Sequence, residues 1–144
     1  MSARLERLAV VERLRGLRVA EAARTLAIAR ARLATHRDRL CELEQYRQAC
    51  IERPQPRPTG IAQLRSVGLF LQHLDSAIVR QRQTLADQQA VCEQAAAQWQ
   101  ARRRQSEAIV QLRERLQRDE ARRRQRHEQK ASDELATLAR RRQA

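Results

Sequence analysis

The sequence is poor in the residues that fill a layered globular core. Its 144 residues include one Trp, one Tyr and one Phe, and aromatic residues make up 2% of the chain. The few β-branched residues do not alternate with polar ones as they would in strands. This composition excludes a layered core, and we expect essentially no β-sheet.

Several features needed for catalysis, metal binding or a membrane span are also missing. The histidines are scattered, and no glycine-rich phosphate loop or Ser/His/Asp grouping occurs. Cys41, Cys50 and Cys92 are odd in number and lack C-x-x-C spacing, so we predict reduced seam or surface thiols and no metal site. No apolar run approaches the ~18 residues of a membrane span. We therefore expect a soluble protein that is not an enzyme, needs no cofactor and does not insert into a membrane.

Helix-forming residues fill the rest of the chain, with one interruption. Ala, Leu, Arg, Gln and Glu dominate, a usage typical of long helices. Pro54, Pro56 and Pro58 stand at alternate positions, and prolines so placed end a helix and favour an extended connector. We predict a single coiled-coil domain over residues 1–144, with a first helix over about 3–52, a connector over 53–60 and a second helix over about 61–140.

Apolar residues recur every seven positions on both sides of the connector, which is typical of a coiled-coil seam. The rows before it are Leu5, Val19, Leu26, Leu33 and Leu40, interrupted by Glu12, and Leu8, Ala22, Ala29, His36, Leu43 and Cys50. The rows after it are Leu64, Leu71, Ile78, Leu85, Cys92 and Trp99, and Val67, Leu74, Ala95 and Ile109. A single short connector brings two such helices back antiparallel. The predicted fold class is therefore all-α, with two long helices in an antiparallel coiled-coil hairpin.

The second predicted helix is the longer one, so we expect it to overhang the first. Residues 117–130 contain one apolar residue, Ala121, and offer little to bury. We expect the i,i+4 pairs Glu114–Arg118 and Glu120–Arg124 to support this segment, at about 0.2–0.5 kcal/mol each.

The formal net charge of +13 is unevenly distributed along the chain. Residues 1–60 carry +6, residues 61–100 carry zero and residues 101–144 carry +7. A concentrated positive charge indicates an acidic protein, a nucleic acid or an anionic membrane as partner. Interleaved acidic residues, few aromatics and the absence of Asn argue against nucleic acid. The basic stretch also lacks the Trp, Phe or Leu face that enters a membrane interface.

The most specific motif lies near the C-terminus, where residues 126–136 read RHEQKASDELA. Leu43-Glu44-Gln45-Tyr46 precedes the connector, Phe70, Leu74, Ala77 and Ile78 follow it, and Trp99 is followed by Arg102 and Arg103. Over almost its full length the chain resembles the FliJ family of the flagellar type III export apparatus.

The resemblance implies a stalk of two antiparallel helices, similar to the central shaft of rotary ATP synthases. Its implied partners are the hexameric export ATPase FliI, the cytoplasmic domain of the export-gate protein FlhA, and substrate export chaperones. Its implied location is the cytoplasm, at the periphery of the inner-membrane export apparatus.

The family's gate-contacting face carries over to seven residues near the connector: Leu43, Tyr46, Cys50, Phe70, Leu74, Ala77 and Gln81. Cys50 departs from the family's pattern, because an aromatic residue is usual at that position. Gln81 departs from it as well, because some members have a histidine at that position. The ATPase contact is expected in the basic C-terminal segment, at Arg122, Arg123, Arg124, Arg126, Glu128, Gln129, Lys130, Asp133 and Glu134.

Three alternatives stay open at this point. The chain could be the equivalent stalk of a virulence-type injectisome, which shares the coiled-coil plan. It could be a generic basic coiled-coil adaptor or a nucleic-acid-associated protein, for which steep salt dependence of DNA binding is the discriminating property. It could also form a homodimeric four-helix assembly in place of a monomeric hairpin.

Overall fold

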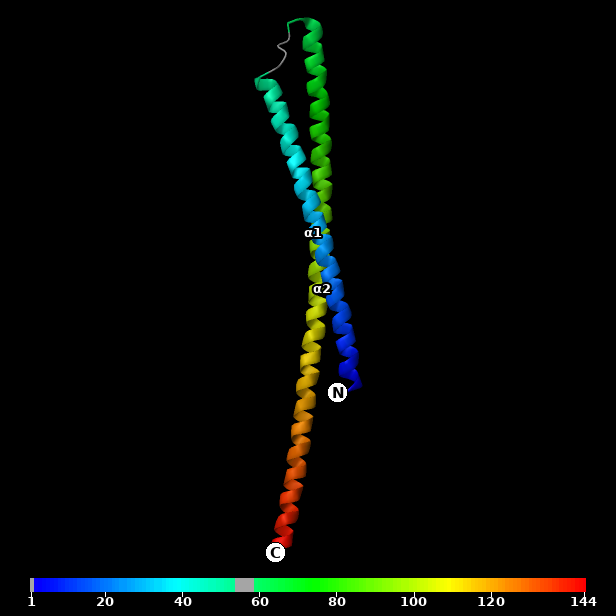
Figure 1. The fold of residues 1–144 in the computed structure, drawn as a ribbon, viewed down its shortest axis with the longest axis vertical. Coiled ribbons are helices and arrows are strands. Elements are labelled where there is room, and N and C mark those ends of the chain that lie inside the picture. The colour runs from blue at the N-terminus through cyan, green and yellow to red at the C-terminus, as the bar shows by residue number, and fades with distance from the viewer. Residues whose placement is uncertain (1, 54–58) are drawn as a thin grey trace. The chain divides into compact units, whose positions relative to one another are not determined.

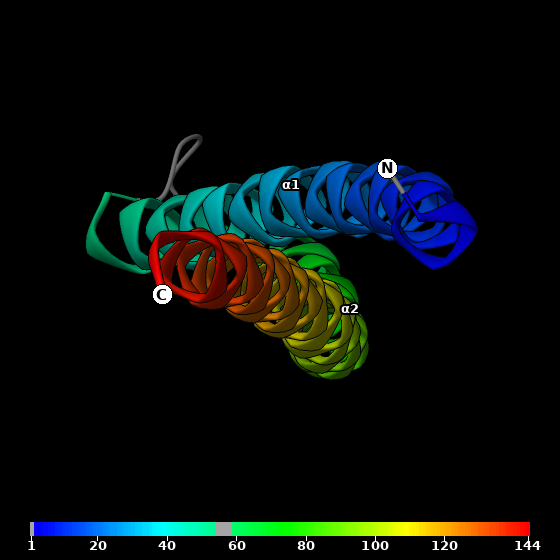
Figure 2. The ribbon, with the colours of Figure 1, turned by 90° about the horizontal axis from the view of Figure 1, so that it is seen from below.

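The computed structural model describes residues 2–53 and 59–144. Helix α1 spans Ala3–Glu52 and helix α2 spans Ile61–Gln143. Each is one uninterrupted ribbon (Figures 1 and 2), and no strand occurs in these described ranges. The all-α fold class with a longer second helix is thus confirmed. The three prolines of the predicted connector lie outside the described residues.

Polar side chains begin both helices. The Ser2 hydroxyl oxygen accepts a hydrogen bond from the Leu5 backbone N–H at 3.3 Å. Before α2, the backbone N–H and the hydroxyl of Thr59 both donate to the Gln63 side-chain oxygen, at 2.7 and 2.8 Å. The first turns of a helix leave backbone groups without intrahelical partners, and such contacts fix the direction in which the chain enters it.

Helix α2 ends at Gln143, a little beyond the expected end near residue 140. No Gly or Pro follows Gly68, so the sequence contains no residue that would stop the helix earlier. Arg140, Arg141 and Arg142 occupy the last turn, where positive charge interacts favourably with the negative end of the helix dipole.

The two helices pass through two compact units. One comprises residues 21–100 and is called here the hairpin unit. The other comprises residues 1–20 and 101–144 and is called the terminal unit. Each has its own contacts between α1 and α2.

In the hairpin unit, a narrow apolar seam joins α1 to α2. Leu26 and Ala29 pack with Ala95, and the partly buried Cys92, Ala96 and Trp99 complete the cluster. The buried apolar side chains of this unit are Ala22, Leu26, Ala29, Leu33, Leu74, Ile78 and Ala95, all members of the predicted heptad rows. Even Ile78 keeps 4% of its surface exposed. The described residues of this unit therefore depend on one line of contacts and enclose no interior.

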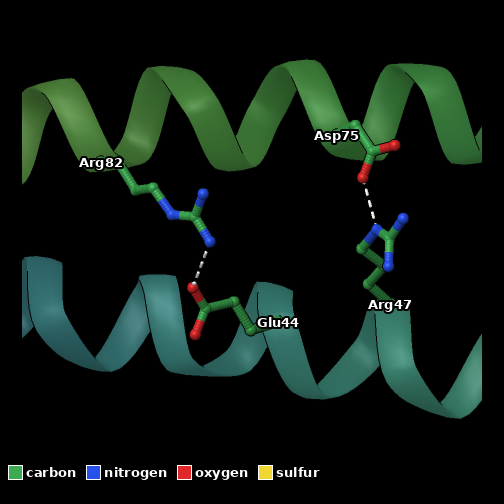
Figure 3. A network of polar contacts seen from close by, with 4 residues as sticks. All are labelled: Glu44, Arg47, Asp75 and Arg82. Atoms are coloured by element: carbon green, nitrogen blue, oxygen red, sulfur yellow. Dashed lines mark hydrogen bonds and ion pairs between the residues drawn. The ribbon is translucent and has the colours of Figure 1, made fainter.

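Polar contacts across the hairpin unit show the direction in which α1 and α2 run relative to each other. Arg47 forms an ion pair with Asp75, and Arg82 Nη2 lies 3.1 Å from Glu44 Oε1 (Figure 3). Farther from the connector, Ala29 packs with Ala95. Falling residue numbers on α1 meet rising numbers on α2, so the helices are antiparallel as predicted.

Charge strengthens the contact between Arg47 and Asp75, and a partly buried hydrogen bond between Gln81 and His36 also joins the two helices. The hydrogen bond and the negative charge of Asp75 raise the pKa of the Arg47 guanidinium above its ordinary value, so Arg47 stays charged. Gln81 Nε2 donates to the His36 carbonyl oxygen at 3.0 Å and lies 3.1 Å from His36 Nδ1. Gln81 therefore links α2 to the α1 backbone directly.

Leu64 is the clearest departure from the predicted rows, since 57% of its surface is exposed. Arg47 lies opposite Asp75, and the first turn of α2 therefore lies beyond the end of α1 in the antiparallel register. A heptad position is buried only where a helical turn faces it.

The three cysteines are free thiols, with Cys50 and Cys92 half-buried and Cys41 exposed.

In the terminal unit, the first part of α1 packs on the middle of α2. Leu5 is 6% exposed, Glu12 Oε2 lies 3.3 Å from Arg113 Nη1, and Arg15 donates to the Gln105 side-chain oxygen at 3.1 Å. Arg113 Nε is buried and has no hydrogen-bond partner among the described residues, so this ion pair retains a desolvation cost.

The overhang of α2 is present within the terminal unit. Every residue from 121 to 144 is exposed. The expected pairs Glu114–Arg118 and Glu120–Arg124 do not form; the i,i+4 ion pair found in the described residues is Arg103–Glu107, at 3.4 Å. Exposed pairs gain little in water and lose side-chain entropy, which explains why the two expected pairs are not made.

We predict that Leu26→Ala lowers the free energy of unfolding by about 2 kcal/mol, because it removes buried methyl groups from the centre of the seam. Ile28→Ala is the matched control, since Ile28 lies two residues away and is 55% exposed. It should change stability by less than about 0.5 kcal/mol. Urea unfolding followed by far-ultraviolet circular dichroism measures both, and equal effects would contradict a seam centred on Leu26.

Candidate interaction surfaces

The seven predicted gate-contact residues lie on α1 and α2 of the hairpin unit, in the half nearer the connector. Leu43, Tyr46 and Cys50 share one face of α1 through their i, i+3 and i+7 spacing. The four on α2 follow i, i+4, i+7 and i+11 spacing, which also gives one face. We call the seven residues together the loop-end surface: Leu43, Tyr46, Cys50, Phe70, Leu74, Ala77 and Gln81.

An aromatic pair forms the exposed part of the loop-end surface. The ring centroids of Tyr46 and Phe70 are 6.1 Å apart, and the ring planes meet at 79° in an edge-to-face arrangement. Tyr46 is 56% exposed and Phe70 is 45% exposed, so both present apolar area to solvent. The structure therefore brings together, from opposite helices, two of the three aromatic residues of the chain.

Other members of the loop-end surface hold the hairpin together. Leu74 is 8% exposed and forms part of the seam. Gln81 uses its amide to bind His36, and Leu43, Cys50 and Ala77 are half-buried. A substitution of Leu74 or Gln81 would alter the contact between α1 and α2 as well as any contact with a partner.

Sequence reasoning missed further exposed apolar residues around the connector. Ile51, Ile61 and Leu69 are 47%, 74% and 57% exposed, and Leu64, assigned to the seam, is exposed as well. The sequence did contain a sign of them, because they are apolar residues close to the connector, where a helix has few or no turns of its partner to face. Large exposed apolar areas mark interaction sites, so they extend the area that a partner could cover.

The nine predicted ATPase-contact residues all lie in the exposed overhang of the terminal unit, between residues 122 and 134. Lys130, Asp133 and Glu134 line a shallow surface depression together with Thr137, Leu138 and Arg141. None of the nine forms an ion pair within the described part of the chain. Their charged groups are thus accessible to a partner.

Charge is concentrated in one of the two units. The terminal unit carries 19 Lys and Arg against 9 Asp and Glu, a net charge of +10. The hairpin unit carries 11 against 8, a net charge of +3. A field of this strength attracts anionic partners and speeds their encounter at low ionic strength.

The surfaces offer contact area and charge, and the described residues contain no cluster of three or more His, Cys, Asp or Glu side chains that could hold a metal ion. Neither helix, over its described length, has a segment apolar enough to cross a bilayer. The arrangement offers two kinds of surface for binding: an apolar aromatic patch in the hairpin unit and a basic exposed helix in the terminal unit.

Comparison with known proteins gives one match. The family model described as the flagellar FliJ protein matches residues 4–144. Searches of curated proteins and of solved structures found no significant match. The family match covers nearly the whole chain and includes both helices and both candidate surfaces, so the chain belongs to the FliJ family of flagellar proteins.

Proposed function

We propose that the chain is the non-catalytic stalk of a flagellar type III protein export apparatus, linking the export ATPase ring to the export gate. The match of the family model to residues 4–144 carries this proposal. The two-helix architecture supports it, because the described residues enclose no large side chain fully and leave most of both helices open to partners.

The loop-end surface is proposed to bind the cytoplasmic domain of FlhA. Aromatic side chains are enriched at interface hot spots, and the Tyr46–Phe70 pair is exposed while its rings make an edge-to-face contact. The ion pairs Arg47–Asp75 and Glu44–Arg82 join the same stretches of α1 and α2, so the two rings are presented on a fixed support (Figure 3).

The basic overhang is proposed to bind the hexameric ring of FliI and to promote its assembly or activity. Arg122, Arg123, Arg124 and Arg126 are exposed and free of ion pairs with described residues. A stalk acts on a ring by binding some of its conformations more tightly than others, which shifts the populations of the ring's states. ATP hydrolysis would belong to the partner alone.

The same proposal places the protein in the cytoplasm, at the periphery of the inner-membrane export apparatus, and includes the escort of substrate export chaperones. A stalk of a virulence-type injectisome is less well supported, because the matching family model is the flagellar one. A nucleic-acid-associated adaptor would bind DNA with a steep salt dependence, which the stalk function does not require.

We predict that Tyr46→Ala combined with Phe70→Ala weakens binding to the FlhA cytoplasmic domain by more than about tenfold, since it removes both exposed rings. Isothermal titration calorimetry measures the affinity, and circular dichroism checks that helicity is kept. Val79→Ala with Val91→Ala is the control, because these exposed residues of α2 lie outside the loop-end surface. An unchanged affinity in the aromatic variant would rule out this gate contact.

We also predict that replacing Arg122, Arg123, Arg124 and Arg126 with Gln slows association with the FliI ring by on the order of tenfold at low salt. Stimulation of the ATPase at limiting stalk concentration should fall with it, while FlhA binding stays intact. Arg140→Gln with Arg141→Gln and Arg142→Gln is a control of similar charge loss on the same exposed segment. Full stimulation by the first variant would contradict the assignment.

A further inference from the structure

The N-terminal part of α1 has two apolar faces, and α2 covers one of them. Within the terminal unit, Leu5 is buried, and Glu12 and Arg15 bind Arg113 and Gln105 of α2. These contacts identify the inner face. On the other side, Val10, Leu14 and Leu17 are 56%, 54% and 62% exposed. We call these three residues the outer stripe.

The outer stripe has the spacing of a coiled-coil seam. Steps of four and three residues separate Val10, Leu14 and Leu17, as they separate consecutive d, a and d positions of a heptad. An amphipathic helix needs one apolar face, and a helix that is apolar on two faces normally has a neighbour on each. The structure supplies that neighbour on the inner face alone.

Arginines border the outer stripe. Arg7 lies three residues before Val10, Arg13 lies between Val10 and Leu17, and Arg18 lies four residues after Leu14, so each is adjacent to the stripe on the helix surface. We call these three the basic rim. All three are exposed, and none forms an ion pair with any described residue. Two acidic residues also border the stripe, Glu6 four residues before Val10 and Glu21 four residues after Leu17.

We propose that the outer stripe docks an acidic amphipathic helix of another protein, with apolar residues against Val10, Leu14 and Leu17 and carboxylates against the basic rim. The stripe is a single line of three residues along the helix, as in a coiled-coil seam, and it is too narrow for a membrane face, which needs a broad apolar side. A second copy of this chain is disfavoured, because its terminal unit also carries +10. The site is separate from the loop-end surface and from the basic overhang.

A designed peptide tests this directly. The probe is a fluorescent peptide of about three heptads with Leu at a and d and Glu at e and g, where the glutamates also prevent self-association. A second peptide carries Lys in place of Glu. Titration with the full chain at about 0.15 M salt, where charges beyond roughly 8 Å are screened, should show that the Glu peptide binds at least about tenfold more tightly than the Lys peptide.

Two pairs of variants locate the site. Leu14→Gln with Leu17→Gln should weaken the Glu peptide by at least about tenfold, whereas Leu135→Gln with Leu138→Gln, exposed to similar degrees on α2, should leave binding within about twofold. Arg7→Gln, Arg13→Gln and Arg18→Gln together should weaken it, whereas the same change at Arg140, Arg141 and Arg142 removes equal charge and should not. Circular dichroism verifies that each variant keeps its helicity.

Three results would overturn the proposal. Equal binding of the Glu and Lys peptides, or equal loss in test and control variants, would show that the stripe does not select an acidic helix. Sedimentation showing a dimer of the chain that Leu14→Gln with Leu17→Gln abolishes would assign the stripe to a second copy. Binding to phosphatidylglycerol vesicles that depends on the same leucines, without peptide binding, would assign it to a membrane surface.

Discussion

The contact between two helices along one face of each is the constraint on which the rest of this structure depends. A helix pair can bury little more than the residues of its facing rows, and here those rows consist largely of Leu, Ala and Ile. No described side chain is enclosed on all sides. The stabilising contacts are therefore distributed along the length of the seam, and most of each helix surface remains available to other molecules.

That constraint explains why the described residues offer open surfaces of different chemistry. The aromatic pair Tyr46 and Phe70 joins α1 to α2 in the half of the hairpin unit nearer the connector. The basic overhang lies in the terminal unit, where α2 continues after its contacts with α1 have ended. The overhang is exposed because α2 has no facing turn of α1 there, and the two rings stay partly exposed because a pair of helices cannot enclose them.

Heptad spacing predicted the buried residues well, because burial between two helices follows the helical period alone. Leu26, Leu33 and Ile78 are examples. Leu64 was wrongly placed, since its burial depends on whether α1 extends far enough to face it. The contacts Arg47–Asp75 and Gln81–His36 could not be predicted, because they require the register between segments that are distant in the sequence.

The candidate surfaces were predictable to a different extent. The sequence placed Tyr46 and Phe70 near the same turn, but their edge-to-face geometry depends on side-chain packing. The outer stripe was missed although Val10, Leu14 and Leu17 show seam spacing, because the row on the opposite face that contains Leu5 already accounted for a seam on this helix. A second apolar face becomes apparent only when the structure shows which face is covered.

The two ion pairs of the hairpin unit also determine which alignments of the helices are disfavoured. Asp75 and Arg82 are seven residues apart on α2, one heptad, so sliding α2 by one heptad keeps apolar rows facing each other. In one direction the slip sets Arg82 opposite Arg47, and in the other it sets Asp75 opposite Glu44. Either slip replaces an attractive ion pair with like-charge repulsion. The two pairs therefore disfavour misaligned hairpins that the apolar seam alone would allow.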